Sequence, residues 1–422
     1  MILRRVAVAT ASLLAVVALA LSMSFAGGAN ANAGGNGAGY SFVHACGQVS
    51  AGFARCHAIQ RLGVRPDRHH PPTPTPTTGG PPPTPTPTPI GGGSCTNPSS
   101  GYTPCDLRTA YSLPSTTSGT GQTVAIVDAF DDPNAEANLG VYRSQFGIAA
   151  CTSANGCFKK VNQNGVQGSY PTGNTGWGQE ISLDLDMVSA ICPNCHILLV
   201  EANSNSFADL AASVNTAASL GANAISNSYG GGEFSSETTD TAFNHPGIAI
   251  TASSGDSGFG AQYPAASPYV TAVGGTTLTQ NGSSFSETAW SGAGSGCSAF
   301  EPQQSWQTAL PAITGVCGNR AIADVSAVAD PNTGVDVYDT YGTGGWVVFG
   351  GTSVASPIIA SVYALAGNEA SLTYGSFSYS HTGSLHDVTS GSNGRCRNVL
   401  CNAQAGWDGP TGNGTPNGTG GF

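Results

Sequence analysis

From Thr123 onward, short apolar runs alternate with segments in which apolar residues recur at helical spacing. Five runs indicate buried strands, at residues 123–130, 196–202, 223–230, 247–255 and 269–275. Three segments between these runs have helical periodicity, at residues 137–147, 178–191 and 207–221. The alternation predicts an α/β fold, doubly wound, with a mostly parallel central sheet and helices on both faces. Functional residues are then expected in turns beyond the carboxyl ends of the strands.

The predicted helix 178–191 carries two carboxyl groups on one face. Glu180 and Asp184 are four residues apart, so they are neighbours on the helix. Two such groups repel, and sharing a proton leaves one neutral while the other ionises. A solvated helix face is the alternative, but no Lys or Arg occurs in residues 161–319 to supply local ion pairs. We expect Asp186, two residues on, to be a surface residue or a minor neighbour.

A serine in a glycine-rich turn is the candidate nucleophile. The stretch GGTSVASP places Ser353 just before a mostly apolar helical segment. There the helix dipole favours developing negative charge. None of the eight histidines lies in a motif that supplies a base. Glu180 is therefore the candidate for taking the serine proton, with Asp184 tuning it.

These motifs together resemble the sedolisins, which are serine-carboxyl peptidases with a subtilisin-like fold. The Glu-x-x-x-Asp helix of that family is matched at residues 180–184, and its Gly-Thr-Ser motif at residues 351–353. Its Gly-Asp-Ser-Gly turn is matched at residues 255–258. The resemblance spans about residues 97–422 and holds four motifs in the family's order, counting a carboxyl-terminal loop described below.

The resemblance implies a role for each matched side chain. Ser353 is the expected nucleophile and Glu180 its general base. Asp184 is expected to support Glu180, and Asp256 to hold the oxyanion. A carboxyl group donates a hydrogen bond only when it is protonated, so activity in acid is expected.

The fourth match is a calcium loop. An Asp-Ile-Thr segment and a later Gly-Trp-Asp correspond to residues 387–389 and 406–408. The resemblance implies one Ca²⁺ ion, held by the side chains of Asp387 and Asp408 and the carbonyls of Val388, Gln404 and Gly406. Oxygen ligands of this kind suit Ca²⁺ better than zinc or copper. Gln404 stands where the family often has glycine, which is compatible only if φ there is negative.

One side chain and the amino-terminal region depart from the family pattern. Tyr229 stands where many members have tryptophan near the substrate cleft, so substrate preference does not carry over. Asp128 occupies the place of the triad aspartate of subtilisins, and we assign it no catalytic role. The family usually has a large folded propeptide, whereas only residues 34–70 precede the linker here. We interpret them as a short propeptide-like or accessory segment.

Residues 1–33 have the pattern of a secretory signal, with a basic start, an apolar run and a final Ala-Asn-Ala. The apolar run is also long enough for a membrane anchor, but the small residues at its end favour cleavage. Residues 71–94 are a Pro/Thr/Gly linker, followed by a peptidase domain over residues 95–422. We expect a proteolytic cut in or near the linker.

Cysteine content and charge suit an oxidising compartment and an acidic medium. Twelve cysteines suit an oxidising compartment. Their spacing suggests the pairs Cys46–Cys56, Cys95–Cys105, Cys151–Cys157, Cys192–Cys195, Cys297–Cys317 and Cys396–Cys401. After residue 70 lie 23 of the 24 acidic residues but only seven of the thirteen basic ones. This balance argues against nucleic-acid binding and suits an acidic medium, where protonated carboxyl groups no longer repel.

The sequence therefore predicts a secreted, extracellular and monomeric endopeptidase that acts on proteins or peptides in acid. No nucleic-acid partner is expected, and no membrane partner after signal removal. A histidine-type subtilisin is one alternative, and it requires a histidine within reach of Ser353. The other is a catalytically inactive secreted binding protein on the same scaffold.

Overall fold

The computed structural model describes residues 40–63 and 96–422. Both ranges belong to one compact unit, Tyr40–Phe422, so residues 40–63 are part of the same unit as the catalytic motifs. The predicted signal and the Pro/Thr/Gly linker lie outside the described residues. Among the helices of the two described ranges, none is long and apolar enough to cross a membrane.

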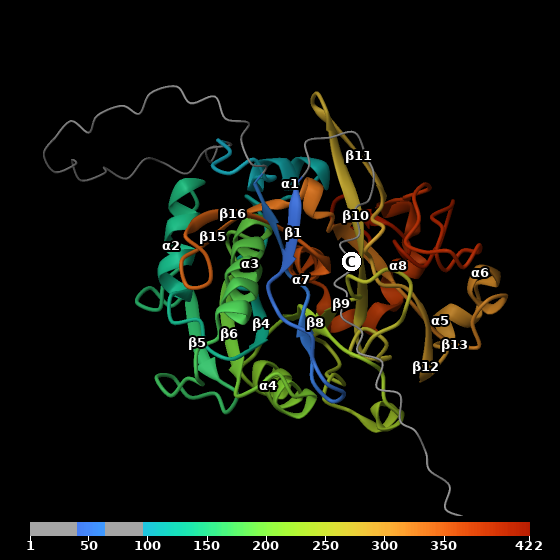
Figure 1. Ribbon diagram of the computed structural model, residues 1–422, viewed down its shortest axis with the longest axis horizontal. Helices are drawn as coiled ribbons and strands as arrows, with labels where there is room; N and C mark the ends of the chain where they lie inside the picture. Colours follow the sequence, from blue (N-terminus) through green and yellow to red (C-terminus); the bar gives the residue numbers. More distant parts are fainter. Residues whose placement is uncertain (1–39, 64–95) are drawn as a thin grey trace, which may run out of the picture. The chain divides into compact units, whose positions relative to one another are not determined.

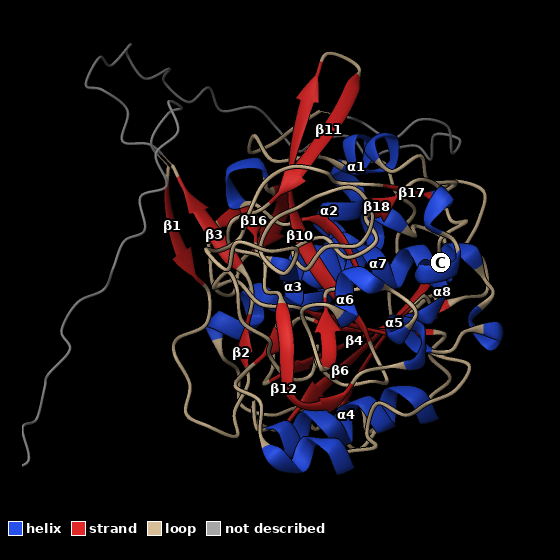
Figure 2. Ribbon diagram, turned by 90° about the vertical axis from the view of Figure 1, so that its right-hand side faces the viewer, coloured by secondary structure: helices blue, strands red, loops and turns tan. Residues whose placement is uncertain are grey.

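The centre of the unit is an eight-stranded sheet (Figures 1 and 2). The strand order is β11-β10-β9-β7-β4-β6-β5, and β14 also pairs with β10. Every pairing is parallel except that of β10 with β11. The strands are β4 (Thr123–Ala129), β5 (Phe158–Asn162), β6 (His196–Ala202), β7 (Ala224–Asn227), β9 (Ala249–Ser253), β10 (Thr271–Asn281), β11 (Ser284–Ala289) and β14 (Val325–Val328). The predicted mostly parallel sheet is confirmed.

Alternate residues of the strands face two separate cores, because successive side chains of a strand point to opposite faces. The long helices are α2 (Ala135–Gln145), α3 (Thr175–Ile191), α4 (Phe207–Ser219) and α7 (Thr352–Ala366). Val124 and Ile126 of β4 pack with α2, α3 and α7. Ala125 and Val127 pack with α4 on the other face. Helices therefore cover both faces, as predicted.

Helix α3 is buried along almost its whole length. It begins after Asn174, whose side-chain oxygen accepts hydrogen bonds from the backbone N–H groups of Gly176 (3.0 Å) and Trp177 (3.2 Å). This cap places the start three residues before the predicted one. The surface position expected for Asp186 is wrong. This side chain is 1% exposed and accepts a hydrogen bond from the backbone of Tyr338 (2.9 Å), because a strand of the second sheet covers that side of α3.

A second sheet has the order β1-β3-β16-β15, and a short pair joins β2 to β8 (Figure 2). Residues 40–63 supply one strand of the pair and two of the sheet. The bounds are β1 (Ser41–His44), β2 (Arg55–Cys56), β3 (Ile59–Leu62), β8 (Tyr229–Gly230), β15 (Val335–Asp339) and β16 (Gly345–Gly350).

The remaining elements are short. The strand pairs are β12 (Gly296–Pro302) with β13 (Asn319–Ile322), and β17 (Leu385–His386) with β18 (Thr415–Pro416). The short helices are α1 (Pro104–Ala110), α5 (Ser305–Thr308), α6 (Pro311–Thr314) and α8 (Phe377–Ser380).

Five of the six predicted disulfides form, and each joins neighbours in the sequence. They are Cys46–Cys56, Cys151–Cys157, Cys192–Cys195, Cys297–Cys317 and Cys396–Cys401. The sixth predicted pair includes Cys95, which lies outside the described residues.

Candidate active site

Ser353 lies in the first turn of α7, directly after strand β16. The preceding Gly351 has φ of 97°, a conformation that glycine adopts without strain. The Ser353 side chain is buried, and its Oγ donates to the carbonyl of Ser228 (3.2 Å). Pro357 has no N–H to bond the Ser353 carbonyl within the helix. That carbonyl instead lies 3.4 Å from Ser228 Oγ, which directly precedes β8.

Glu180 of α3 faces this turn and is fully buried. Burial, and then the charge of Asp184, raise the pKa of Glu180 well above its usual range. The Ser353 hydroxyl opposes this shift, because it lies close enough to stabilise the ionised carboxylate. Oε2 accepts from the backbone N–H of Ala58 (2.7 Å). Glu180 therefore lies beside the serine, as the sequence predicted.

Asp184 lies one turn further along α3 and is also fully buried. Its Oδ1 accepts from Ser228 Oγ (2.9 Å). Burial, and then the charge of Asp128, raise its pKa well above the usual range. The hydrogen bond from Ser228 and the nearby Glu180 carboxyl oppose the shift. No sequence motif marks Ser228, although this serine directly follows β7 at the carboxyl end of the parallel strands, where functional residues are expected.

Two carboxyl oxygens of this pair have no donor in the described ranges. They are Oε1 of Glu180 and Oδ2 of Asp184. An ionised carboxylate only accepts hydrogen bonds, whereas a protonated one can donate. Two adjacent buried carboxylates would leave both oxygens unpaired and both charges uncompensated. A proton shared between Glu180 and Asp184 pairs the two oxygens and neutralises one of the two charges.

Asp256 lies in the turn after β9 and faces the start of α7. Its Oδ1 accepts from the N–H (2.8 Å) and the hydroxyl (2.9 Å) of Thr352. Oδ2 is buried, with no hydrogen-bond partner among the residues that the structure describes. Burial outweighs the two Thr352 hydrogen bonds and raises the pKa of Asp256 to about 7. Below that pH the carboxyl is protonated, and Oδ2 is free to donate.

Asp128 lies in β4, behind the Glu180–Asp184 pair. Within the described chain, both of its carboxyl oxygens are buried without a hydrogen-bond partner. Burial, and then the charges of Glu180 and Glu201, raise its pKa well above the usual range. Asp128 is therefore a buried neighbour of the Glu180–Asp184 pair, and we assign it no step in the reaction.

One histidine, His57, also lies at the site, although no sequence motif marked it. Its Nδ1 bonds Ser253 Oγ (2.7 Å) and its Nε2 bonds Gln262 Oε1 (3.1 Å). Both ring nitrogens are thus engaged away from Ser353. Burial, and then the charge of Arg55, lower the pKa of His57 to about 3. A base with so low a pKa is poorly suited to a histidine-type mechanism near neutral pH.

Tyr229 presents its backbone to the site and its ring to the core. The ring is fully buried near Trp177, with 6.2 Å between the ring centroids. The hydroxyl donates to Asn227 Oδ1 (2.7 Å). The residue therefore contributes to the site as part of strand β8.

The predicted calcium ligands come together in one loop region. Asp387 Oδ2 accepts from the N–H of Gly406 (2.9 Å), and Asp408 Oδ2 from the N–H of Gln404 (3.1 Å). Burial raises the pKa of Asp408 to about 7, and the nearby charge of Asp387 adds to this shift. Gln404 has no positive φ, so the backbone accepts a residue other than glycine there. Two neighbouring carboxylates fit a hard cation that prefers oxygen ligands.

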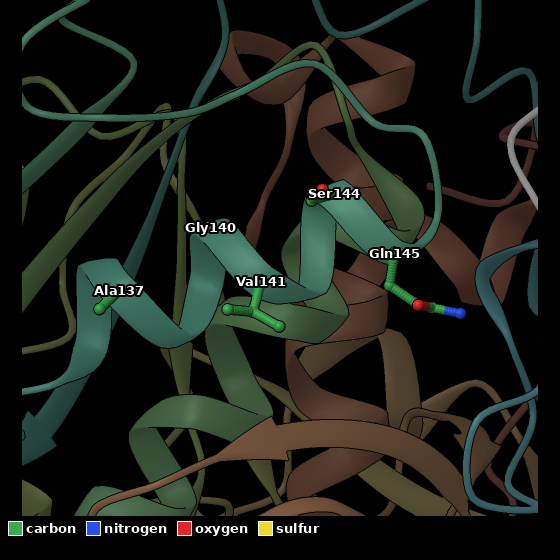
Figure 3. Close-up of a pocket in the computed structure, with 5 residues that line it drawn as sticks. All are labelled: Ala137, Gly140, Val141, Ser144 and Gln145. Carbon is green, nitrogen blue, oxygen red and sulfur yellow. The ribbon is translucent and has the colours of Figure 1, made fainter. Parts of the chain in front are cut away.

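A surface depression along α2 contains none of these residues. Figure 3 shows its lining, which comes from a single helix: Ala137, Gly140, Val141, Ser144 and Gln145. The chemistry-bearing side chains instead face residues 54–62, which lie across the ends of α3 and α7.

Comparison with known proteins agrees with this site. Residues 171–376 match the model of the Subtilase family, so fold and site define a subtilisin-like protein. Kumamolisin of Bacillus sp. (strain MN-32) is 30% identical over 354 residues, covering 75% of this chain and 62% of kumamolisin. Sedolisin of Pseudomonas sp. (strain 101) is 39% identical over 173 residues, covering 36% of this chain and 28% of sedolisin. These matches support a sedolisin-family, subtilisin-like protein, as its motifs predicted.

A solved structure agrees over a longer stretch. Pseudomonas sedolisin, a serine-carboxyl proteinase complexed with two molecules of pseudo-iodotyrostatin, aligns with a TM-score of 0.64 and 27% identity. The alignment covers 76% of this chain and 96% of that one. The chain spans less than two thirds of the length of the curated relatives named above.

Proposed function

We propose that this protein is a secreted, acid-active serine-carboxyl endopeptidase. One observation carries the proposal: Ser353, Glu180, Asp184 and Asp256 surround one turn, and three of their buried carboxyl oxygens are without a donor in the described residues. Such a group of carboxyl groups is stable only if it holds protons. It can then supply both a base and an acid to a serine nucleophile.

In the proposed mechanism, Ser353 Oγ attacks the carbonyl carbon of the scissile bond. Glu180 takes the serine proton and returns it to the leaving amine, while Asp184 holds the shared proton. Protonated Asp256 donates from Oδ2 to the oxygen that becomes negative, and the start of α7 stabilises the same charge. Water then releases the acyl group from Ser353 by the reverse proton transfers.

The direct test is hydrolysis of a denatured protein between pH 3 and 7, with labelling of Ser353 by a peptide aldehyde or phosphonate. We expect hydrolysis in acid and labelling at Ser353. A protein that neither hydrolyses nor becomes labelled would instead be the inactive binding protein considered above.

We expect Asp256 to set the upper pH limit of activity. With residues 54–62 in place, burial raises its pKa to about 7, so the protonated donor is present below that pH and lost as the pH rises through it. Asp256→Asn keeps a donor at every pH, so activity should fall less between pH 5 and 8 than in the wild type. Asp256→Ala removes the donor and should lower kcat by about 10²- to 10³-fold. Equal pH limits in the wild type and Asp256→Asn would contradict this role.

We propose that Asp387 and Asp408, with the carbonyls of Val388, Gln404 and Gly406, hold one Ca²⁺ ion. When bound, the ion neutralises two neighbouring carboxylates and stabilises the carboxyl-terminal loops. At a free Ca²⁺ concentration of 100 times Kd, the free energy of unfolding should rise by about 2.7 kcal/mol.

The calcium proposal is tested by thermal unfolding with Ca²⁺ and with a chelator. Asp408→Asn should abolish the Ca²⁺-dependent rise in Tm. Asp330→Asn should keep it, because Asp330 accepts a backbone hydrogen bond from Asn332 (2.9 Å) in another loop. If a chelator leaves the Tm of the wild type unchanged, the calcium proposal is wrong.

Secretion is part of the same proposal. Residues 1–33 have the signal pattern, and five disulfides indicate an oxidising compartment.

A further inference from the structure

Residues 54–62 lie along the active site as an added pair of strands. On one side of Ser353, β2 pairs antiparallel with β8, and Arg55 faces Gly230. On the other side, β3 pairs antiparallel with β16, the strand that leads into the nucleophile turn. Figure 1 shows the blue segment 40–63 beside β8, and Figure 2 shows β3 next to β16. Extended peptides bind to proteins in this way, by adding to exposed strand edges.

The peptide bond between His57 and Ala58 lies among the catalytic groups. The N–H of His57 donates to the carbonyl of Ser228 (3.2 Å), the same carbonyl that accepts from Ser353 Oγ. The N–H of Ala58 donates to Glu180 Oε2 (2.7 Å). The nitrogen that would become the leaving amine is thus already bonded to the proposed proton donor.

The carbonyl oxygen of the same bond lies near Asp256, the proposed oxyanion donor. A methyl group built on Gly351 would lie 1.8 Å from the His57 oxygen and 3.0 Å from Asp256 Oδ2. Only glycine therefore leaves room for this carbonyl next to Asp256. The nitrogen of this peptide bond thus lies at Glu180 and its carbonyl oxygen lies near Asp256, as the proposed mechanism requires of a substrate.

Burial and side-chain contacts hold the segment in this register. Ala54, Cys56 and Ala58 have no exposed surface, and His57 is 4% exposed. The His57 ring lies in a polar pocket between Ser253 and Gln262, bonded at both nitrogens. The segment is therefore seated as a bound substrate is, with one side chain in a fitted pocket and its backbone paired on both sides.

We propose that the His57–Ala58 bond is the first bond this protein cuts, and that residues 54–62 block the cleft until then. The inference rests on the proposed peptidase function and adds to it the position of self-processing. It moves the expected cut from the linker at residues 71–94 to a bond between β2 and β3.

The step uses only groups of this chain and water. Ser353 Oγ bonds to the His57 carbonyl carbon while its proton passes to Glu180. The bond to the Ala58 nitrogen breaks as Glu180 gives that nitrogen the proton, and Ala58 becomes a free amine. Water then attacks the ester carbon of His57 and gives one proton to Glu180. The bond from this carbon to Ser353 Oγ breaks, Glu180 passes the proton to Ser353 Oγ, and His57 is left with a free carboxyl group.

The cut alone does not empty the cleft. The Cys46–Cys56 disulfide lies wholly in the amino-terminal fragment, so it does not tie the fragment to the rest of the chain. Strand β1 of the fragment still pairs with β3, which lies after the cut. The N–H of Ala45 also bonds the carbonyl of Ala58 (2.9 Å) across the cut. We therefore expect a lag between cleavage and full activity while the fragment dissociates.

The test uses the full chain, purified near neutral pH and then brought to pH 4. Intact mass and amino-terminal sequencing over time should show a new chain that begins at Ala58 and a fragment that ends at His57. Ser353→Ala should remain uncut. Ala58→Pro removes the N–H that reaches Glu180 and should block this cut, whereas Ala58→Ser keeps the N–H and should be cut as the wild type is.

A synthetic peptide of residues 53–62, with Cys56→Ser, keeps the test valid if Ala58→Pro does not fold. The active enzyme should cut this peptide between His57 and Ala58. An enzyme that hydrolyses a denatured protein while its own His57–Ala58 bond and the peptide stay intact would overturn the inference and leave the proposed function standing. A wild type that neither hydrolyses protein nor reacts with the aldehyde would contradict both the self-processing inference and the proposed peptidase function.

Discussion

Ser353→Ala is expected to lose all measurable hydrolysis while it folds as the wild type does. The substitution removes the nucleophile, and removing a triad member in serine peptidases typically costs at least about 10³-fold in kcat. The lost hydroxyl makes one hydrogen bond, to the Ser228 carbonyl, so the effect on stability should be small. The measurements are kcat/KM at pH 4 and Tm.

Ser361→Ala in the same helix is the matched control. The Ser361 hydroxyl is buried, and it has no hydrogen-bond partner in the described part of the chain. Its removal should leave both activity and Tm near the wild-type values. Hydrolysis by Ser353→Ala above about a hundredth of the wild-type rate would show that another group is the nucleophile.

Glu180→Gln should lower kcat by about 10²- to 10⁴-fold, with a smaller change in KM, because a general base contributes effects of that size. Glutamine keeps the shape of the side chain and an oxygen that can accept from Ala58, but it cannot take a proton. Asp184→Asn should cost less, since Asp184 acts through Glu180. The loss in Glu180→Gln should persist at every pH between 3 and 8.

Glu201→Gln provides the control for removing a buried acid. Glu201 is fully buried and pairs with Lys160 (2.9 Å), and it makes no hydrogen bond to Ser353. Its substitution should change stability more than kcat. If Glu180→Gln were as active as the wild type, the carboxyl base would be wrong, and each histidine would have to be replaced in turn.

The sequence predicted those features that depend on short motifs or on the local spacing of apolar residues. The spacing of Glu180 and Asp184, and the turns around Asp256 and Ser353, sufficed to predict four side chains that the fold brings together. The parallel sheet followed from apolar runs separated by helical segments. These features are local, so a short window of sequence contains them.

The parts that could not be predicted depend on pairing between distant segments. Asp186 is buried because β15, about 150 residues further along the chain, covers that side of α3. The position of His57 depends on β2 meeting β8 and β3 meeting β16. Ser228 has no unusual sequence context, and only the end of strand β7 gives it a place beside Asp184. Such contacts follow from the assembled fold rather than from local pattern.

The central claim is that carboxyl groups sharing protons serve a serine in place of an imidazole. The pH dependence of wild-type kcat/KM for a short peptide, measured from pH 3 to 9 after self-processing is complete, tests it most directly. We expect activity in acid that declines as the pH approaches neutrality and does not return at higher pH, because the carboxyl groups then lose their protons. An optimum near pH 8 would contradict it.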